Sequence, residues 1–212
     1  AFAAGITVVL WASAFVGIRD LADAFSPGSI ALGRLLIGAA LLGILVARRG
    51  WQPVPRRDLW LIAASGVLWL AGYNLALNEA ERHVDAGTAS MLVNTGPILI
   101  ALFAGLFLGE GLPGRLLVGI AIAFAGAIVI GVATQAATGA ESSLLGIGLC
   151  FVAAVAYALG VTVQKPATRS VSALQLTWIA CVVGMVVCLP FLPGLVNEAS
   201  AVASGPAAAG KL

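Results

Sequence analysis

Charged side chains are scarce in this sequence of 212 residues, which contains 11 Lys or Arg and 9 Asp or Glu. Soluble domains carry roughly 25% charged residues, whereas here the charged share is 9% and the hydrophobic share is 61%. So few charges cannot cover a water-facing surface, which excludes a soluble globule. The net charge is only +2, and no basic stretch is interleaved with aromatic residues, which argues against nucleic-acid binding. We therefore expect a polytopic membrane protein whose first partner is the lipid bilayer.

Residues that build metal sites, disulfides and catalytic centres are also few. Cys150, Cys181 and Cys188 lie in apolar runs without a CxxC spacing, so we expect buried thiols and neither disulfides nor zinc ligands. His83 is the single histidine and belongs to no HExxH motif. The sequence also lacks GxSxG, P-loop and dinucleotide-binding motifs. We predict no catalytic residue, no metal and no cofactor, and hence a protein that is not an enzyme.

Long apolar runs, in contrast, fill most of the chain. A helix needs about 20 apolar residues to cross the hydrocarbon core of a membrane. The charges separate seven such runs, and the short connections between them favour one antiparallel all-α bundle. The predicted spans are at about 1–18, 26–47, 59–78, 86–108, 115–134, 144–164 and 172–192.

The distribution of basic residues predicts the orientation of the bundle. Short cytoplasmic loops hold an excess of Lys and Arg, and the loops after the second, fourth and sixth predicted spans carry most of them. The opposite loops carry mainly Asp and Glu. We therefore expect the amino terminus on the cytoplasmic side of the plasma or inner membrane. The basic residues on that side are Arg48, Arg49, Arg56, Arg57, Arg115, Lys165 and Arg169.

A weak internal repeat divides the chain near residue 139. Residues 11–15 (WASAF) align with residues 157–161 (YALGV), which places an aromatic residue on the first span of each half. Five spans precede residue 139, and because five is odd, a second copy starts from the opposite side of the membrane. The repeat therefore predicts two halves with inverted topology.

Three stretches resemble the EamA-type transporters of the drug/metabolite transporter superfamily. They are residues 73–80 (YNLALNEA), 86–99 (AGTASMLVNTGPIL) and 106–110 (LFLGE), which are similar to the third and fourth helices of that family. Trp11 and Arg34 also fit the family pattern.

The resemblance implies the domain organisation and the function. Residues 1–138 would be a first EamA repeat of five helices, and residues 139–212 would be a partial second repeat with two helices and a tail. We read residues 193–212 as a loop or an artificial end and expect three further helices in a complete ten-helix protein. The implied function is a secondary transporter that exports amino acids or similar small metabolites by alternating access without ATP. The alternatives are a structural or regulatory membrane subunit and an integral-membrane enzyme.

Polar and aromatic residues inside the spans are the candidate binding residues, because polar groups in a bilayer tend to face a cavity or another helix. Arg34 could anchor an anionic group or bond to helix-end carbonyls. Asn74 and Asn78 share a helix face beside Tyr73, and they could line a cavity or join two helices. We expect Trp11, Arg34, Tyr73, Asn74, Asn94 and Tyr157 to bind a small-molecule substrate.

Two further patterns concern helix shape and packing. Pro97 removes a helical hydrogen bond, so Gly96 and Pro97 predict a kink or break beside Asn94. Small residues recur every four positions in the fifth span, which favours close contact with a helix of the same chain or of a homodimer partner. This ridge consists of Gly119, Ala123, Ala127 and Gly131.

The spans contain no Asp, Glu, Lys or His that could carry a coupling proton. Glu79, Glu81 and Glu110 fall at span ends, where we expect water to keep them ionised. This pattern predicts a uniporter or an exchanger.

Overall fold

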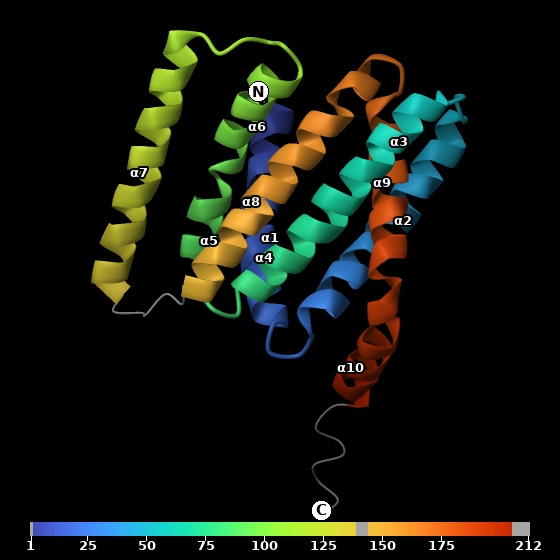
Figure 1. The fold of residues 1–212 in the computed structure, drawn as a ribbon. Helices are drawn as coiled ribbons and strands as arrows, with labels where there is room; N and C mark the ends of the chain where they lie inside the picture. The colour runs from blue at the N-terminus through green and yellow to red at the C-terminus, as the bar shows by residue number, and fades with distance from the viewer. Residues whose placement is uncertain (1, 139–143, 205–212) are drawn as a thin grey trace, which may run out of the picture.

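The computed structural model describes residues 2–138 and 144–204, and within these ranges the chain forms helices joined by short turns, without any strand (Figure 1). The predicted all-α class is therefore confirmed. The elements are α1 (Phe2–Leu21), α2 (Pro27–Arg49), α3 (Arg56–Ser65), the π-helix η1 (Gly66–Tyr73), α4 (Asn74–Ala80), α5 (Ala86–Val93), α6 (Gly96–Phe107), α7 (Gly114–Thr138), α8 (Leu144–Gln164), the 3-10 helix η2 (Lys165–Arg169), α9 (Ala173–Cys188), the 3-10 helix η3 (Leu189–Phe191) and α10 (Leu192–Ser204).

Within the described residues, five helical stretches are long and apolar enough to cross a membrane. Four of them coincide with predicted spans two, three, four and six, and the fifth extends predicted span seven. They are Pro27–Arg49, Arg56–Ala80, Ala86–Phe107, Leu144–Arg169 and Ala173–Ser204. The two remaining predicted spans lie in α1 and α7. That α1 and α7 also cross the membrane stays a prediction, as does the inverted repeat.

Helix α8 lies in the middle of the bundle, between α6 and α4 (Figure 1). Its inner face carries small residues at helical spacing, and Cys150, Ala153, Ala154 and Ala158 are fully buried. Small side chains let neighbouring backbones approach closely. At Gly160 the approach is so close that a Cβ atom would lie 2.7 Å from the Cβ of Trp69. This packing holds Tyr157, the aromatic residue of the face, against its neighbours.

The reading of residues 193–212 as a loop is wrong for the part that the structure describes. Helix α10 occupies Leu192–Ser204 and continues the direction of α9 (Figure 1). Pro193 is tolerated in its first turn, where the missing N–H would have no helical partner, and the alanines that follow are strong helix formers. The carboxylate of Glu198 accepts a hydrogen bond from the backbone N–H of Ser26, at 3.1 Å, which ties α10 to the start of α2.

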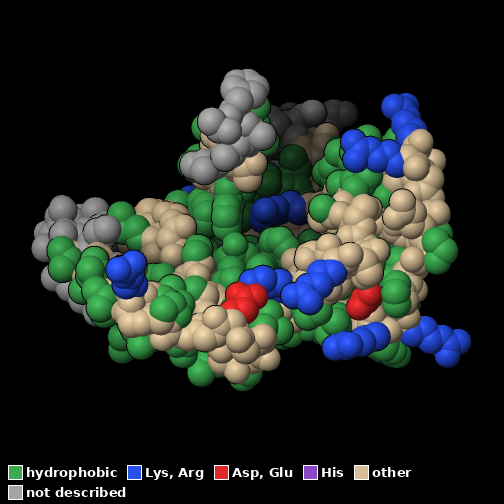
Figure 2. Space-filling view, turned by 90° about the horizontal axis from the view of Figure 1, so that it is seen from above, with side chains coloured by type: hydrophobic (Ala, Val, Ile, Leu, Met, Phe, Trp, Pro, Cys, Tyr) green, Lys and Arg blue, Asp and Glu red, His purple; other side chains and the backbone are tan. Residues whose placement is uncertain are grey.

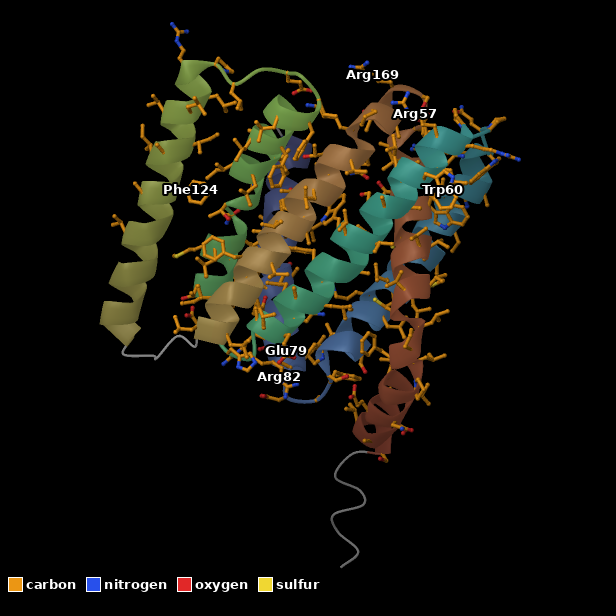
Figure 3. All side chains as sticks on the ribbon, viewed as in Figure 1. Arg57, Trp60, Glu79, Arg82, Phe124 and Arg169 are labelled. Atoms are coloured by element: carbon orange, nitrogen blue, oxygen red, sulfur yellow. The ribbon has the colours of Figure 1, made fainter. Side chains whose placement is uncertain are left out.

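The two ends of the bundle differ in charge. The connections α2–α3, α6–α7 and α8–α9 lie at one end, and they carry the basic residues that the sequence analysis grouped together (Figure 1). Figure 2 views this end, where Lys and Arg side chains predominate over Asp and Glu. Figure 3 shows Arg57 and Arg169 at the same end and Glu79 and Arg82 at the other. This arrangement is the one that the loop charges predict for alternating spans.

Helix α7 lies at the edge of the bundle and packs against α5 (Figure 1). At Gly119, a Cβ atom would find no other described atom within 4 Å. The side chains of Ala123, Ala127 and Gly131 lie outside the described residues. A partner helix for this ridge, in the same chain or in a homodimer, therefore stays a prediction.

Candidate functional site

A cavity of about 600 Å³ lies among α1, α2, η1, α4, α8 and α9. Its volume is typical of a site for a small molecule. Its wall is mostly apolar and includes five of the six predicted binding residues. These are Trp11, Arg34, Tyr73, Asn74 and Tyr157.

Tyr157 is the centre of the aromatic wall. Its ring centroid lies 5.8 Å from that of Trp11, 5.6 Å from that of Trp69 and 5.8 Å from that of Tyr73. These separations lie within the range that favours edge-to-face and tilted pairs. Tyr73 and Tyr157 are buried, whereas Trp11 is 38% exposed. The wall thus presents one accessible indole, backed by three packed rings.

Trp69 belongs to this wall, although the sequence analysis did not include it among the binding residues. It lines the cavity from the π-helix η1. The sequence does contain a signal for it, because Trp69 precedes Tyr73 by four residues and therefore shares its helix face. π-Helical stretches are rare and are frequently found at functional sites.

A break in the helix lies on the other side of Tyr157. Helix α5 ends at Val93, and α6 begins at Gly96 with Pro97 in its first turn. The hydroxyl of Thr95 donates to the carbonyl oxygen of Leu92 at 2.7 Å, inside the turn between the two helices. A Cβ atom on Gly96 would lie 2.5 Å from Cδ1 of Tyr157. The missing side chain at this position therefore lets the tyrosine ring pack onto the break.

Asn94 lines a second cavity, of about 420 Å³, and not the first one. The second cavity lies between α1 and α5, and Ser90 and Val93 also line it. Trp11 and Phe15 line both cavities, so the two spaces adjoin along α1. The six predicted residues are therefore distributed over two neighbouring cavities that share one tryptophan.

Arg34 brings a positive charge to the first cavity. It lies two turns into α2, its side chain is exposed, and no hydrogen bond or ion pair joins it to another described residue. It interacts electrostatically with Tyr73 and Glu81. A guanidinium group that is free in a largely apolar cavity can bind a carboxylate through two parallel hydrogen bonds.

The two asparagines of the third span have different roles. Asn74 lines the cavity, and its Nδ2 donates to the carbonyl oxygen of Leu70 on the same helical stretch, at 2.8 Å. Asn78 is fully buried, and its Nδ2 donates to the carbonyl oxygen of Pro27 at 3.0 Å. Each of the two alternatives from the sequence therefore applies to one residue, since Asn74 faces a cavity and Asn78 joins α4 to α2.

The expectation that the three glutamates at span ends are solvated is wrong for Glu81. Its side chain is fully buried, and neither carboxylate oxygen has a hydrogen-bond partner among the described residues. Burial raises the pKa of Glu81 to about 7, although the charges of Arg34 and Arg19 act in the opposite direction. The other two glutamates fit the expectation. Glu79 is partly exposed and lies 3.0 Å from His83, and Glu110 is partly exposed and paired with a lysine.

Asp85, near Glu81 in the sequence, is a carboxylate that does have hydrogen-bond partners. It precedes α5, and its oxygens accept from the amide and the hydroxyl of Thr88 at 3.0 and 2.5 Å. Burial alone would raise the pKa of Asp85, but these hydrogen bonds outweigh it and leave the pKa below its ordinary value. Glu81 has no such partners, which makes it the exception.

At the basic end, one ion pair joins η2 to the turn that follows α6. The Nζ of Lys165 lies 2.6 Å from Oε1 of Glu110, and both side chains are about half exposed. A third, smaller cavity lies beside this pair. Among the described residues, no group of three or more His, Cys, Asp or Glu side chains could hold a metal ion.

These features define a polytopic helical membrane protein with an aromatic cavity large enough for a small solute. Comparison with known proteins gives the family. The EamA-like transporter family matches residues 1–132. The chain therefore belongs to the EamA-like transporter family, as the resemblance of its third and fourth spans indicated.

Curated relatives cover almost the whole chain. A "Probable terminal-alkyne amino-acid exporter" of Streptantibioticus cattleyicolor is 35% identical over 91% of this chain and 63% of its own length. An uncharacterized transporter of Archaeoglobus fulgidus is 30% identical over 91% of this chain and 67% of its own length. An uncharacterized transporter of Bacillus subtilis is 31% identical over 91% of this chain and 62% of its own length. The chain thus spans about two thirds of the length of these relatives. No solved structure gives a significant match to the chain.

Proposed function

We propose that this chain forms the solute-binding part of a secondary transporter that exports amino acids or similar small metabolites across the plasma or inner membrane. Transport would proceed by alternating access without ATP, with the amino terminus in the cytoplasm. The observation that carries the proposal is Arg34, which lines an aromatic cavity and forms no hydrogen bond or ion pair with another described residue. Its charge suits the carboxylate of an amino acid, and the aromatic wall suits an apolar or unsaturated side chain.

One of the relatives supports this substrate class. The exporter of Streptantibioticus cattleyicolor is named for amino acids that carry a terminal alkyne. An alkyne is linear and thin, with π electrons around its whole axis, so it can lie against the faces and edges of aromatic rings. The cavity of about 600 Å³ has room for a solute of this size together with water. Asn94 and the adjoining cavity would form part of the route along which the solute leaves or enters.

The test is counterflow of propargylglycine, an amino acid with a terminal alkyne, in proteoliposomes that contain the purified protein. Vesicles loaded with unlabelled propargylglycine should accumulate the labelled compound. Replacing Arg34→Gln should lower the initial rate about tenfold or more, because a hydrogen bond to a charged group contributes roughly 1.5–3 kcal/mol. Arg57→Gln is the matched control, since Arg57 is exposed at the basic end. An unchanged rate in Arg34→Gln would contradict the proposed site.

A further inference from the structure

Glu81 is a buried carboxylate that the packing of the protein leaves without a hydrogen bond. Its side chain is fully buried, and both carboxylate oxygens lack a partner among the described residues. An unpaired ionised carboxylate inside a protein is strongly unfavourable, and a buried polar group without a partner calls for an explanation. The nearby Asp85 shows that the same region can supply hydrogen bonds to a carboxylate. Glu81, unlike Asp85, is therefore a carboxylate without partners among the described residues.

Charged and titratable groups from α1, α2, η1 and α8 interact with Glu81. Arg19 of α1 bonds through Nη1 to the backbone carbonyls of Glu81 and Val84, and not to the carboxylate. Arg34 of α2 attracts the carboxylate without forming an ion pair. The titratable groups of the remaining neighbours are the Tyr73 hydroxyl from η1 and the Cys150 thiol from α8. Two cations thus favour the ionised form, while burial favours the protonated form.

A stripe of polar residues connects Glu81 to the cavity. Asn74, Asn78 and Glu81 lie at positions i, i+4 and i+7, which places them on one helix face. Asn74 lines the cavity, and Oδ1 of the buried Asn78 lacks a partner, as the carboxylate does. Arg34 lines the same cavity and interacts electrostatically with Glu81. The charge of Glu81 and the occupancy of the cavity therefore act on the same guanidinium group.

We propose that Glu81 is a proton-binding site of the transporter and that Arg34 links it to solute binding. When a solute carboxylate binds Arg34, it adds a negative charge near Glu81 and competes for its cation, so Glu81 takes up a proton from solution. By reciprocity, protonation of Glu81 increases the affinity for the solute by the same factor. The solute and one proton thus bind together. The link to a solute rests on the proposed transport function, whereas the proton site itself does not.

The first measurement needs no solute. Infrared difference spectra of the reconstituted protein, recorded between pH 5 and 9, should show a carboxylic-acid C=O band that disappears with a midpoint near neutral pH. Glu81→Gln should remove this band. Glu79→Gln should keep it, because Glu79 lies two residues earlier, is partly exposed and is paired with His83. A protein without a band that titrates near neutral pH, or with one that persists in Glu81→Gln, would overturn the proposal.

The second measurement tests the link through Arg34. Replacing Arg34→Gln removes a cation that favours the ionised carboxylate, so the midpoint of the band should move to higher pH. Arg57→Gln should leave it unchanged. An unchanged midpoint in Arg34→Gln would overturn the link, even if Glu81 titrates. This experiment also remains informative if Glu81→Gln fails to fold, because it follows the native carboxylate.

The third measurement adds the solute. Counterflow of propargylglycine should become faster as the pH falls from 8 to 6 in the native protein and in Glu79→Gln, and it should be independent of pH in Glu81→Gln. A linkage of one pKa unit corresponds to about a tenfold change in solute affinity. Counterflow that is equally fast at both pH values in the native protein would overturn the coupling while the transport function stands. If counterflow is absent at every pH, the proposed function fails, and the infrared titrations still decide whether Glu81 binds a proton.

Discussion

The contact between Gly96 and Tyr157 gives a sharp test of the cavity wall. A Cβ atom at position 96 would lie 2.5 Å from Cδ1 and 2.8 Å from Cε1 of Tyr157. The ring cannot move away freely, since its other sides pack against Trp11, Trp69 and Tyr73 at centroid distances of 5.6–5.8 Å. Replacing Gly96→Ala should therefore overpack the aromatic cluster.

The expected cost of Gly96→Ala is about 1–3 kcal/mol, which is typical of extra methyl groups in a packed core. Unfolding in mixed micelles, followed by tryptophan fluorescence, measures it. Gly148→Ala on α8 is the matched control, because a Cβ atom there meets no described atom within 4 Å. That control should be neutral, or more stable by up to about 1 kcal/mol through helix propensity.

A double-mutant cycle assigns the effect to the tyrosine ring. In a Tyr157→Ala background, Gly96→Ala should no longer destabilise the protein, because the ring that it displaces is absent. Counterflow of propargylglycine by Gly96→Ala should fall along with stability, since a displaced Tyr157 disturbs the wall that faces the solute. If Gly96→Ala is as stable as the native protein, the ring does not pack on the helix break and the described cavity wall is wrong.

Three further predictions concern charges. Burial raises the pKa of Glu81 from 4.5 to about 7, so between these pH values the folded protein holds more protons than the unfolded chain. The free energy of unfolding should therefore decline by up to about 3 kcal/mol as the pH rises through this window. In a series of unfolding curves at different pH values, Glu81→Gln should show a flatter pH dependence. The half-exposed pair of Lys165 and Glu110 should show a coupling of less than about 1 kcal/mol in a double-mutant cycle, and a larger value would mean that the pair is shielded from water. A cysteine at Arg82 should react with an impermeant reagent in intact cells and one at Arg57 should not; the reverse pattern would invert the proposed orientation.

Much of the fold could be predicted from the sequence, because apolar runs and charged loops directly reflect the chemistry of a membrane. Pro97 lies at the break between α5 and α6 because a proline cannot donate the helical hydrogen bond. Trp11 and Tyr157, aromatic residues well inside apolar runs of the sequence, make an edge-to-face contact in the cavity wall. In these cases a single local property, such as hydropathy or a missing N–H, determines the outcome.

Features that depend on tertiary packing could not be predicted in this way. Helix α10 has a proline and a glycine near its start and is rich in alanine near its end, so its composition suits a loop as well as a helix. Its contact with α2, through Glu198 and Ser26, is visible only in three dimensions. The π-helical stretch that presents Trp69 to the cavity has no signature in hydropathy. The sequence pattern also placed Asn94 in the same cavity as Tyr73, whereas in the structure Asn94 lines the adjoining cavity between α1 and α5.

Glu81 shows why position along a span is a poor guide to the state of a charge. In the sequence it lies between Glu79 and Arg82, in the most charged stretch of the chain, where a solvated carboxylate is the natural expectation. Glu79 is partly exposed and Arg82 is exposed, but a helix turns by about 100° per residue, so side chains one or two positions apart face different surroundings. The spacing from Asn74 and Asn78 aims Glu81 at the interior, toward α1, α2 and α8. The helix face on which Glu81 lies determines the direction of its side chain, and its position near a loop does not. A protein whose spans contain no carboxylate can therefore still bury a protonatable group.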